Sequence, residues 1–201
     1  MQFTICQSQL KAMLNLASKQ DIRFYLCGVN VVYTSNMTRL IATDGHKLGI
    51  FNFTPESEDD NIGAGSLIIP REVIENLPKS KHDPLLVITK EDKEGYWKIT
   101  AAGIQTIFGQ IEGTFPDYAR VCNFTTNGEP ATYNFEYLMA FLKTQKELKG
   151  DKISMPMIYQ NGSSAALVRL SGVDNFVGVI MPMRTGVESQ AGAKVESRFT
   201  I

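Results

Sequence analysis

The chain has 201 residues, enough for one large domain or two ordinary ones, and 43% of them are hydrophobic, as expected of a globular protein with a core. Twenty Lys and Arg nearly balance 21 Asp and Glu, for a formal net charge of -1. This balance does not favour a nucleic-acid coat or a membrane-surface protein, although a basic stripe on one face is compatible with it.

The N-terminus lacks the charged and apolar regions of a secretory signal, and no apolar run approaches the roughly 18 residues of a spanning helix. Cys6, Cys27 and Cys122 are far apart and form no CxxC pair. We therefore expect a soluble cytoplasmic protein with three reduced thiols, without membrane contact, disulfides or a zinc site.

Hydrophobic periodicity predicts a first structural unit in residues 1–53. A strand at Met1–Ile5 precedes a helix, whose apolar residues recur at i, i+3, i+4 and i+7: Leu10, Met13, Leu14 and Ala17. Strands are predicted at Phe24–Thr34, Arg39–Thr43 and Lys47–Phe53. The acidic segment Thr54–Gly65 is typical of an exposed loop.

The same order of elements recurs in a second unit. A strand at Ser66–Ile69 is followed by a helix that begins near Pro70 and ends before Pro78. Strands are predicted at Leu85–Thr89, Tyr96–Ala101 and Gln105–Ile111. The segment Cys122–Glu129 is predicted to be a linker.

A third unit follows the linker. Its predicted strand, Ala131–Asn134, leads into a helix at Phe135–Leu148 with a single apolar stripe. Strands are predicted at Ile153–Tyr159, Ala166–Leu170 and Phe176–Met181. The stripe, with Phe141 beside it, favours self-association, and residues 185–201 are expected to be a mobile tail.

The three units predict an α+β fold of strand–helix–three-strand modules. A helix with one apolar stripe must pack against a partner, so two units make a natural domain. We expect one two-unit domain at residues 1–122 and a single unit at residues 130–184.

Four stretches resemble signature stretches of the bacterial DNA polymerase III beta subunit family, the sliding clamps. In chain order they are DIRFYLCGV (Asp21–Val29), ATDGHKLGI (Ala42–Ile50), FPDYARV (Phe115–Val121) and VIMPMR (Val179–Arg184). The resemblance implies a DNA clamp fold, with helices on one side and antiparallel sheets on the other. Family chains have six units in three domains. Residues 1–122 resemble the middle domain, and residues 130–184 resemble the second half of the last domain.

The resemblance also implies a function. Clamps are not enzymes and need no cofactor; their subunits form rings around double-stranded DNA. DNA polymerase and the clamp loader insert a short hydrophobic peptide into a pocket between the middle and last domains. We therefore expect a homo-oligomeric processivity factor. A peptide-binding adaptor or decoy that never encircles DNA is the alternative.

Carried over by position, the pocket comprises residues from both domains. They are Leu26, Thr43, Gly45, His46, Lys47, Leu48, Pro116, Arg120, Val121, Asn134, Tyr137, Val179, Met181, Pro182, Met183 and Arg184. Lys47 stands where an arginine is more usual, which loses a planar donor fork but keeps the charge. Adaptable methionines suit a site that accepts several sequences, although a Val/Met strand is more often simply core.

Lysines on the predicted helices are candidates for DNA contact through phosphates, which needs no base recognition. The candidates are Lys11, Lys19, Gln20, Arg23, Tyr25, Arg71, Lys79, Lys81, Lys143, Lys146, Lys149 and Lys152. An ordinary solvated helix face would have the same pattern.

Catalysis and metal binding are not indicated. His46 has Asp44 nearby, but the chain has no nucleophile elbow, and His82 lies in a polar loop. Neither HExxH nor CxxC spacing occurs, and the acidic run Glu56–Asp60 lacks the pattern of a calcium loop. Asp44-Gly45 instead predicts a hairpin turn that presents His46 for recognition.

Overall fold

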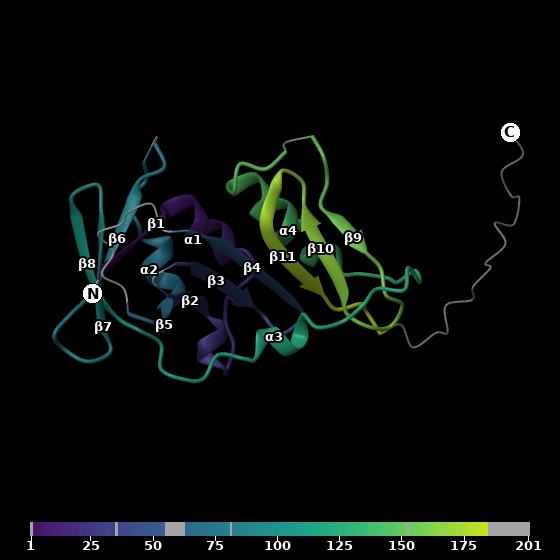
Figure 1. Cartoon of the computed structure of the whole chain (residues 1–201), viewed down its shortest axis with the longest axis horizontal. Helices are drawn as coiled ribbons and strands as arrows, with labels where there is room; N and C mark the ends of the chain where they lie inside the picture. The colour runs from purple at the N-terminus through teal and green to yellow at the C-terminus, as the bar shows by residue number, and fades with distance from the viewer. Residues whose placement is uncertain (1, 35, 55–62, 81, 152, 185–201) are drawn as a thin grey trace, which may run out of the picture.

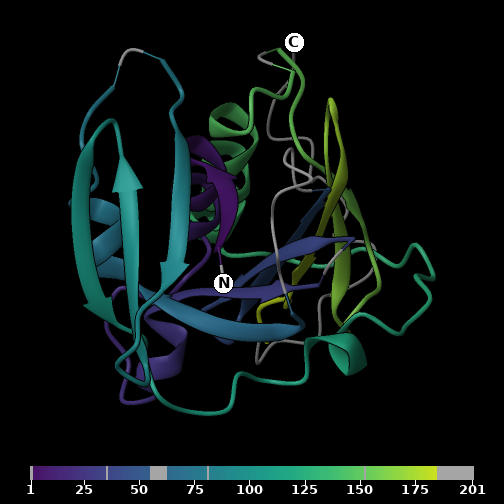
Figure 2. The same cartoon turned by 60° about the vertical axis from the view of Figure 1, so that its left-hand side comes forward.

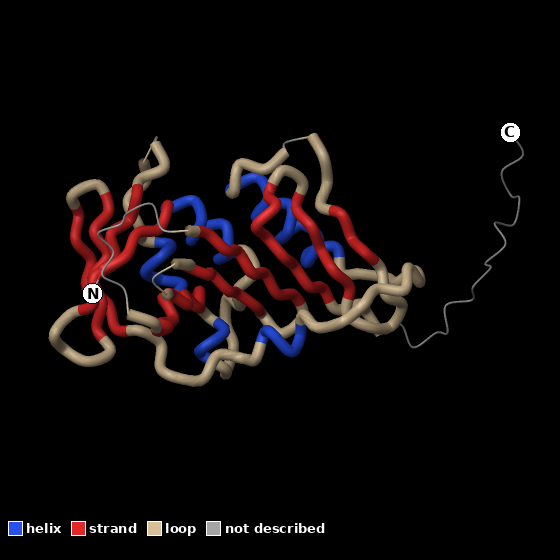
Figure 3. Tube along the Cα trace, viewed as in Figure 1, coloured by secondary structure: helices blue, strands red, loops and turns tan. Residues whose placement is uncertain are grey.

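The computed structural model describes residues 2–34, 36–54, 63–80, 82–151 and 153–184 (Figure 1). All strand pairs are antiparallel, and they form one four-stranded and one seven-stranded sheet. In Figure 3 the helices gather on one side of the sheet that spans the molecule. The molecule therefore has the α+β architecture that the sequence predicts.

The first two units have the predicted order of elements. The first contains β1 (Gln2–Cys6), α1 (Gln7–Leu14), the short 3-10 helix η1 (Phe24–Leu26), β2 (Gly28–Tyr33), β3 (Thr38–Thr43) and β4 (Lys47–Phe53). The second contains β5 (Gly65–Pro70), α2 (Arg71–Glu75), β6 (Leu85–Lys90), β7 (Tyr96–Ala101) and β8 (Ile104–Gly109).

These two units exchange their leading strands. β1 of the first unit pairs with β6 of the second, and β5 of the second pairs with β2 of the first. The aromatic rings of Phe3, Tyr33 and Trp97 meet between the two sheets, with centroids 5.1 to 6.1 Å apart. Figure 2 brings the four-stranded sheet forward and shows the helices behind it. The exchange and the shared core make the two units one body.

The third unit joins this body through its last strand. It contains α4 (Phe135–Glu147), β9 (Met157–Tyr159), β10 (Ala166–Leu170) and β11 (Val173–Ile180). β11 pairs with β4, which extends one sheet to the order β5-β2-β3-β4-β11-β10-β9. α4 lies beside α1, and the Thr144 hydroxyl donates a hydrogen bond to the Ala12 carbonyl at 3.1 Å.

The environment of Phe141 contradicts one prediction. Its side chain is fully buried and meets the Phe176 ring edge-on, with centroids 6.3 Å apart. Phe141 therefore packs α4 against the sheet of its own unit. The prediction that Phe141 helps α4 to self-associate is wrong.

Four local predictions also differ from the structure. The strand predicted at Ile153–Tyr159 is limited to Met157–Tyr159, because Ile153 and Ser154 form bends that hydrogen bonds to the Asp151 carboxylate hold. Residues 131–134 form no strand, because the third unit has no partner unit to pair with this segment among the described residues. Phe24–Leu26 is a 3-10 helix, because the amides of Leu26 and Cys27 donate to the carbonyls of Arg23 and Phe24, and β2 begins only at Gly28. The helix α3 (Tyr118–Val121) was not predicted; Asp117 caps it by accepting a hydrogen bond from the Arg120 amide.

Candidate functional site

The seam between β4 and β11 is the centre of the candidate site. Leu48 faces Val179 across the ladder, and their neighbours Gly49 and Gly178 also face each other. Leu48 and Val179 belong to a small apolar cluster with Ile41. The segment 115–124 packs on this cluster, which makes the seam the floor of a concave surface.

The turn before β4 projects over this floor. The Asp44 carboxylate accepts hydrogen bonds from the amides of His46 and Lys47, both at 2.9 Å, and it also pairs with the Lys47 ammonium. Gly45 has a φ of 93°, which a side chain would strain. Asp44 is therefore a turn-forming residue, and this geometry assigns it no catalytic role.

His46 connects the turn to the third unit. Its carbonyl accepts a hydrogen bond from the Met181 amide at 2.8 Å. Its exposed ring stacks on Tyr137 of α4, with centroids 5.6 Å apart and an interplanar angle of 10°. The ring is thus held at the rim by a neighbour from another unit.

A cavity of about 270 Å³ opens above the seam. Its lining residues come from η1, the turn, β4, α3 with its preceding loop, and β11. They are Arg23, Leu26, Thr43, Gly45, His46, Lys47, Leu48, Phe115, Pro116, Tyr118, Val121, Val179 and Met181. Ten of them belong to the predicted pocket, so the structure brings together segments that are up to 155 positions apart, from Leu26 to Met181.

Six predicted pocket residues do not line the cavity. Asn134 caps α4 by accepting a hydrogen bond from the Glu136 amide at 2.8 Å. Tyr137 supports His46 from the helix side. The Met183 amide binds the Thr132 carbonyl. The remaining three are Arg120, Pro182 and Arg184.

Three lining residues were missed as pocket residues. Phe115 and Tyr118 lie in the recognised FPDYARV stretch, and their packing on the seam could have been expected from their size. Arg23 was assigned to DNA, but its guanidinium lies over Gly45 and pairs with Asp21 at 2.8 Å. Hydrogen bonds from Arg23 hold the pKa of Asp21 down at about 2.

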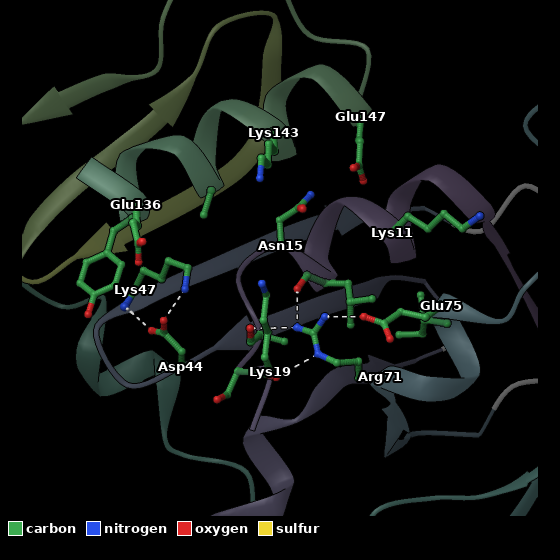
Figure 4. Close-up of a pocket in the computed structure, with 16 residues that line it drawn as sticks. Lys11, Asn15, Lys19, Asp44, Lys47, Arg71, Glu75, Glu136, Lys143 and Glu147 are labelled. Atoms are coloured by element: carbon green, nitrogen blue, oxygen red, sulfur yellow. Dashed lines mark hydrogen bonds and ion pairs between the residues drawn. The ribbon is translucent and has the colours of Figure 1, made fainter. Parts of the chain in front are cut away.

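A second, larger groove lies on the helix side. Its volume is about 680 Å³, and it runs between α1, α2 and α4 (Figure 4). Basic residues around it are Lys11, Lys19, Lys47, Arg71 and Lys143; acidic ones are Asp44, Glu75, Glu136 and Glu147. Four predicted DNA-contact residues thus share this face, but its charge is mixed.

Arg71 has a structural task within this groove. Its guanidinium donates to the carbonyls of Leu14, Ala17 and Ser18 at 2.9 to 3.0 Å, and it pairs with Glu75. Leu14 is the last residue of α1, where cations are favoured, and Ala17 and Ser18 lie in the segment just after it. Arg71 therefore holds α1 against α2 and has few donors left for a phosphate.

The other DNA candidates are dispersed. Lys149 pairs with Asp83 at 3.2 Å, and Tyr25 packs beside Gly113. Gln20, Lys79 and Lys146 are exposed, as is Lys149. Lys81 and Lys152 lie outside the described residues, as do the tail 185–201 and most of the loop Thr54–Gly65.

Within the described ranges, no three His, Cys, Asp or Glu side chains form a potential metal site. In the same ranges, no helix has the length and apolar character needed to cross a membrane.

The arrangement of sheets and helices is that of a sliding clamp. The DNA polymerase sliding clamp of Pseudomonas aeruginosa superposes with a TM-score of 0.66 at 19% identity, covering 92% of this chain and 67% of that one. A putative DNA polymerase III beta subunit from Eubacterium rectale gives 0.67 at 11% identity, over 92% and 66% of the two chains. The fold is therefore the predicted clamp fold.

Sequence comparison identifies the family. Residues 4–117 match the DNA polymerase III beta subunit central domain, and the chain belongs to this family. The beta sliding clamp of P. aeruginosa is 30% identical over 132 residues, and that of Pseudomonas putida is 28% identical over 119. These matches cover 59% and 57% of this chain but only 33% and 32% of the relatives, so the chain matches about a third of their length.

Proposed function

We propose that this chain is a clamp-like replication factor, not an enzyme, and that the cavity at the β4–β11 seam holds a short hydrophobic peptide of its partner proteins. One observation carries the proposal: two stretches that resemble clamp signatures meet there, with Leu48 opposite Val179. The partners would be DNA polymerase and the clamp loader. Residues 1–122 would act as the two-unit domain and residues 130–184 as a half domain.

The chemistry of the cavity fits such a ligand. Its floor is apolar, from Leu26, Leu48 and Val179, and its volume of about 270 Å³ admits only one or two large side chains. His46 and Arg23 at the rim provide donors for a peptide carbonyl or a glutamine. A few polar groups around an apolar hollow are typical of ligand sites.

Fluorescence anisotropy with a labelled peptide that carries glutamine, leucine and phenylalanine tests this proposal. We expect saturable binding that Met181→Ala weakens roughly tenfold, because Met181 lines the cavity and is 40% exposed. Met157→Ala is the matched control, since Met157 is similarly exposed but lies on β9. Absent binding, or equal effects of both substitutions, would remove the assignment.

The mixed charge of the helix side is compatible with two modes of action for this protein. In the first, the protein oligomerises around duplex DNA, and Lys11, Lys19 and Lys143 approach the phosphates. In the second, the protein is an adaptor or decoy that uses the peptide cavity without encircling DNA. Carboxylates lie between these lysines and Arg71 is already engaged, so less positive charge is available for phosphates in the first mode.

Nicked circular DNA distinguishes these two modes. An encircling protein stays on the circle at high salt and is lost when the DNA is linearised, because it slides off the ends. A protein held only by phosphate contacts dissociates as salt rises, on either form of DNA. Salt-resistant retention on the circle would exclude the adaptor mode.

A further inference from the structure

Apolar surface around the peptide cavity stays uncovered in the described part of the chain. The floor residues Leu48 and Val179 are buried. Val121 and Met181 also line the cavity, but they are 43% and 40% exposed, and the neighbouring Met183 is 51% exposed. Exposed apolar side chains that gather at a hollow are typical of a contact site. The cavity and its rim therefore offer apolar area to a ligand.

The chain itself leaves the third unit at this rim. β11 ends at Ile180, and the next residue, Met181, donates its amide to the His46 carbonyl at 2.8 Å. The Met183 amide donates to the Thr132 carbonyl, also at 2.8 Å. These two hydrogen bonds fix the backbone up to the point from which the tail, residues 185–201, continues. The tail lies outside the described residues, but it is attached beside the cavity.

The sequence of the tail contains side chains of the kind that the cavity accepts. It reads TGVESQAGAKVESRFTI, and its two largest apolar residues are Phe199 and Ile201. In an extended segment these alternate residues point to the same side, and Arg198 and Thr200 point to the opposite side. The apolar cavity of about 270 Å³ admits one or two large side chains. The pair therefore matches the cavity in number and in apolar character.

The tail is long enough to return to the cavity of its own chain. Fourteen residues lie between Arg184 and Phe199. A connection of this length spans about 50 Å when fully extended, whereas the three steps from Met181 to Arg184 span about 10 Å at most. Gly186 and Gly192 in the connection allow the backbone to turn back.

We propose that Phe199 and Ile201 occupy the peptide cavity of their own chain, with His46 and Arg23 donating hydrogen bonds to carbonyls of the tail. This role of the tail rests on the proposed peptide site and adds its regulation, because a partner peptide must displace the tail. A segment joined to its site by a short connection acts at an effective concentration of about a millimolar. The tail therefore competes with a partner peptide even when its own affinity is modest.

Fluorescence anisotropy with the labelled glutamine–leucine–phenylalanine peptide tests the competition in the whole chain. Phe199→Ala combined with Ile201→Ala should lower the Kd of this peptide roughly tenfold, because a cavity that is occupied about nine-tenths of the time shows about a tenth of its intrinsic affinity. Val187→Ala is the matched control, since it removes an apolar side chain from the same tail and should leave the Kd unchanged. The tenfold change should not depend on protein concentration, because the tail and the cavity belong to one chain.

A labelled peptide of residues 190–201 tests the contact itself, without any partner peptide. It should bind saturably to the chain that carries Phe199→Ala and Ile201→Ala, because the cavity of that chain is vacant. A further Met181→Ala should weaken this binding roughly tenfold, since Met181 lines the cavity, and Met157→Ala on β9 should not.

Four results would overturn the proposal. The first is a Kd of the partner peptide that the double substitution leaves unchanged, and the second is an equal effect of Val187→Ala. The third is an effect that grows with protein concentration, which would assign the contact to the tail of another copy. The fourth is a 190–201 peptide that does not bind, or whose binding ignores Met181→Ala. If the glutamine–leucine–phenylalanine peptide binds neither chain, the proposed function fails, and the 190–201 peptide still decides whether the tail occupies the cavity.

Discussion

The glycine at position 178 offers a quantitative test of how the third unit is attached. It lies in β11 opposite Gly49 of β4, directly beneath α4. A Cβ atom added there would stand 2.6 Å from Cε1 of Phe141, 3.0 Å from Cβ of Val168 and 3.1 Å from Cε1 of Phe176. All three residues are fully buried, so none of them has room to retreat. Gly178→Ala should therefore overpack the interface between α4 and β11.

Overpacking a well-filled core typically costs about 1–3 kcal/mol. The closest contact is with the edge of a buried ring, so we expect the free energy of unfolding to fall by about 2 kcal/mol. For a chain of this size, this lowers Tm by roughly 4–8 °C. Urea unfolding followed by circular dichroism gives the free energy, and an unchanged m-value would show that the native surface is preserved.

Gly109→Ala is the matched control, because a Cβ atom there meets only Tyr96, at an ordinary 4.0 Å. Its effect should stay within about 0.5 kcal/mol. Phe141→Leu combined with Gly178→Ala should cost less than the sum of the two single changes, because the smaller side chain frees the space. Strict additivity, or a loss at Gly178 no larger than at Gly109, would refute the packing argument.

Two further predictions concern α1. Arg71→Met should lower the free energy of unfolding by about 2 kcal/mol in urea titrations, because three carbonyls at the end of α1 and in the segment after it lose a charged donor; Lys79→Met, at an exposed position, should have little effect. Burial alone would raise the pKa of Asp83, but hydrogen bonds from Ser8 and the Lys149 ammonium outweigh it, so the pKa is lowered. The stabilisation by Asp83 is therefore complete above its ordinary pKa, near 3.8, and is lost as pH falls through the lowered folded pKa. Tm measured from pH 6 to 2 should fall less steeply for Asp83→Asn, and parallel curves would contradict this.

Strand positions could be predicted from the sequence where each strand has neighbours. The predicted bounds of Lys47–Phe53 and Tyr96–Ala101 are those of β4 and β7. Residues 131–134 have a strand-like sequence but no ladder, because a strand depends on its partner as well as on its own pattern. The hydrophobic periodicity of residues 131–134 cannot show whether another strand is available to pair with them.

The cavity could be predicted only in part, for a related reason. Position by position, the resemblance located residues on β4 and β11, where backbone pairing fixes their direction. It did not locate cavity-lining side chains where a polar group bonds to its own backbone neighbours, as Asn134 does when it caps α4. Arg23 is the converse case: the sequence pattern assigned it to DNA contact, and the structure places it at the cavity rim, where it pairs with Asp21.

The two edges of the third unit differ in what they require from the rest of the fold. The cavity needs β11 beside β4, and five facing residue pairs provide this contact without any strand from a fourth unit. β9, in contrast, has no counterpart among the described residues to the strand β5 that covers β2. The third unit therefore forms the cavity floor without a fourth unit, while β9 is an end strand of the sheet. The cavity and this end strand are structurally independent, because they lie on opposite edges of the same three strands.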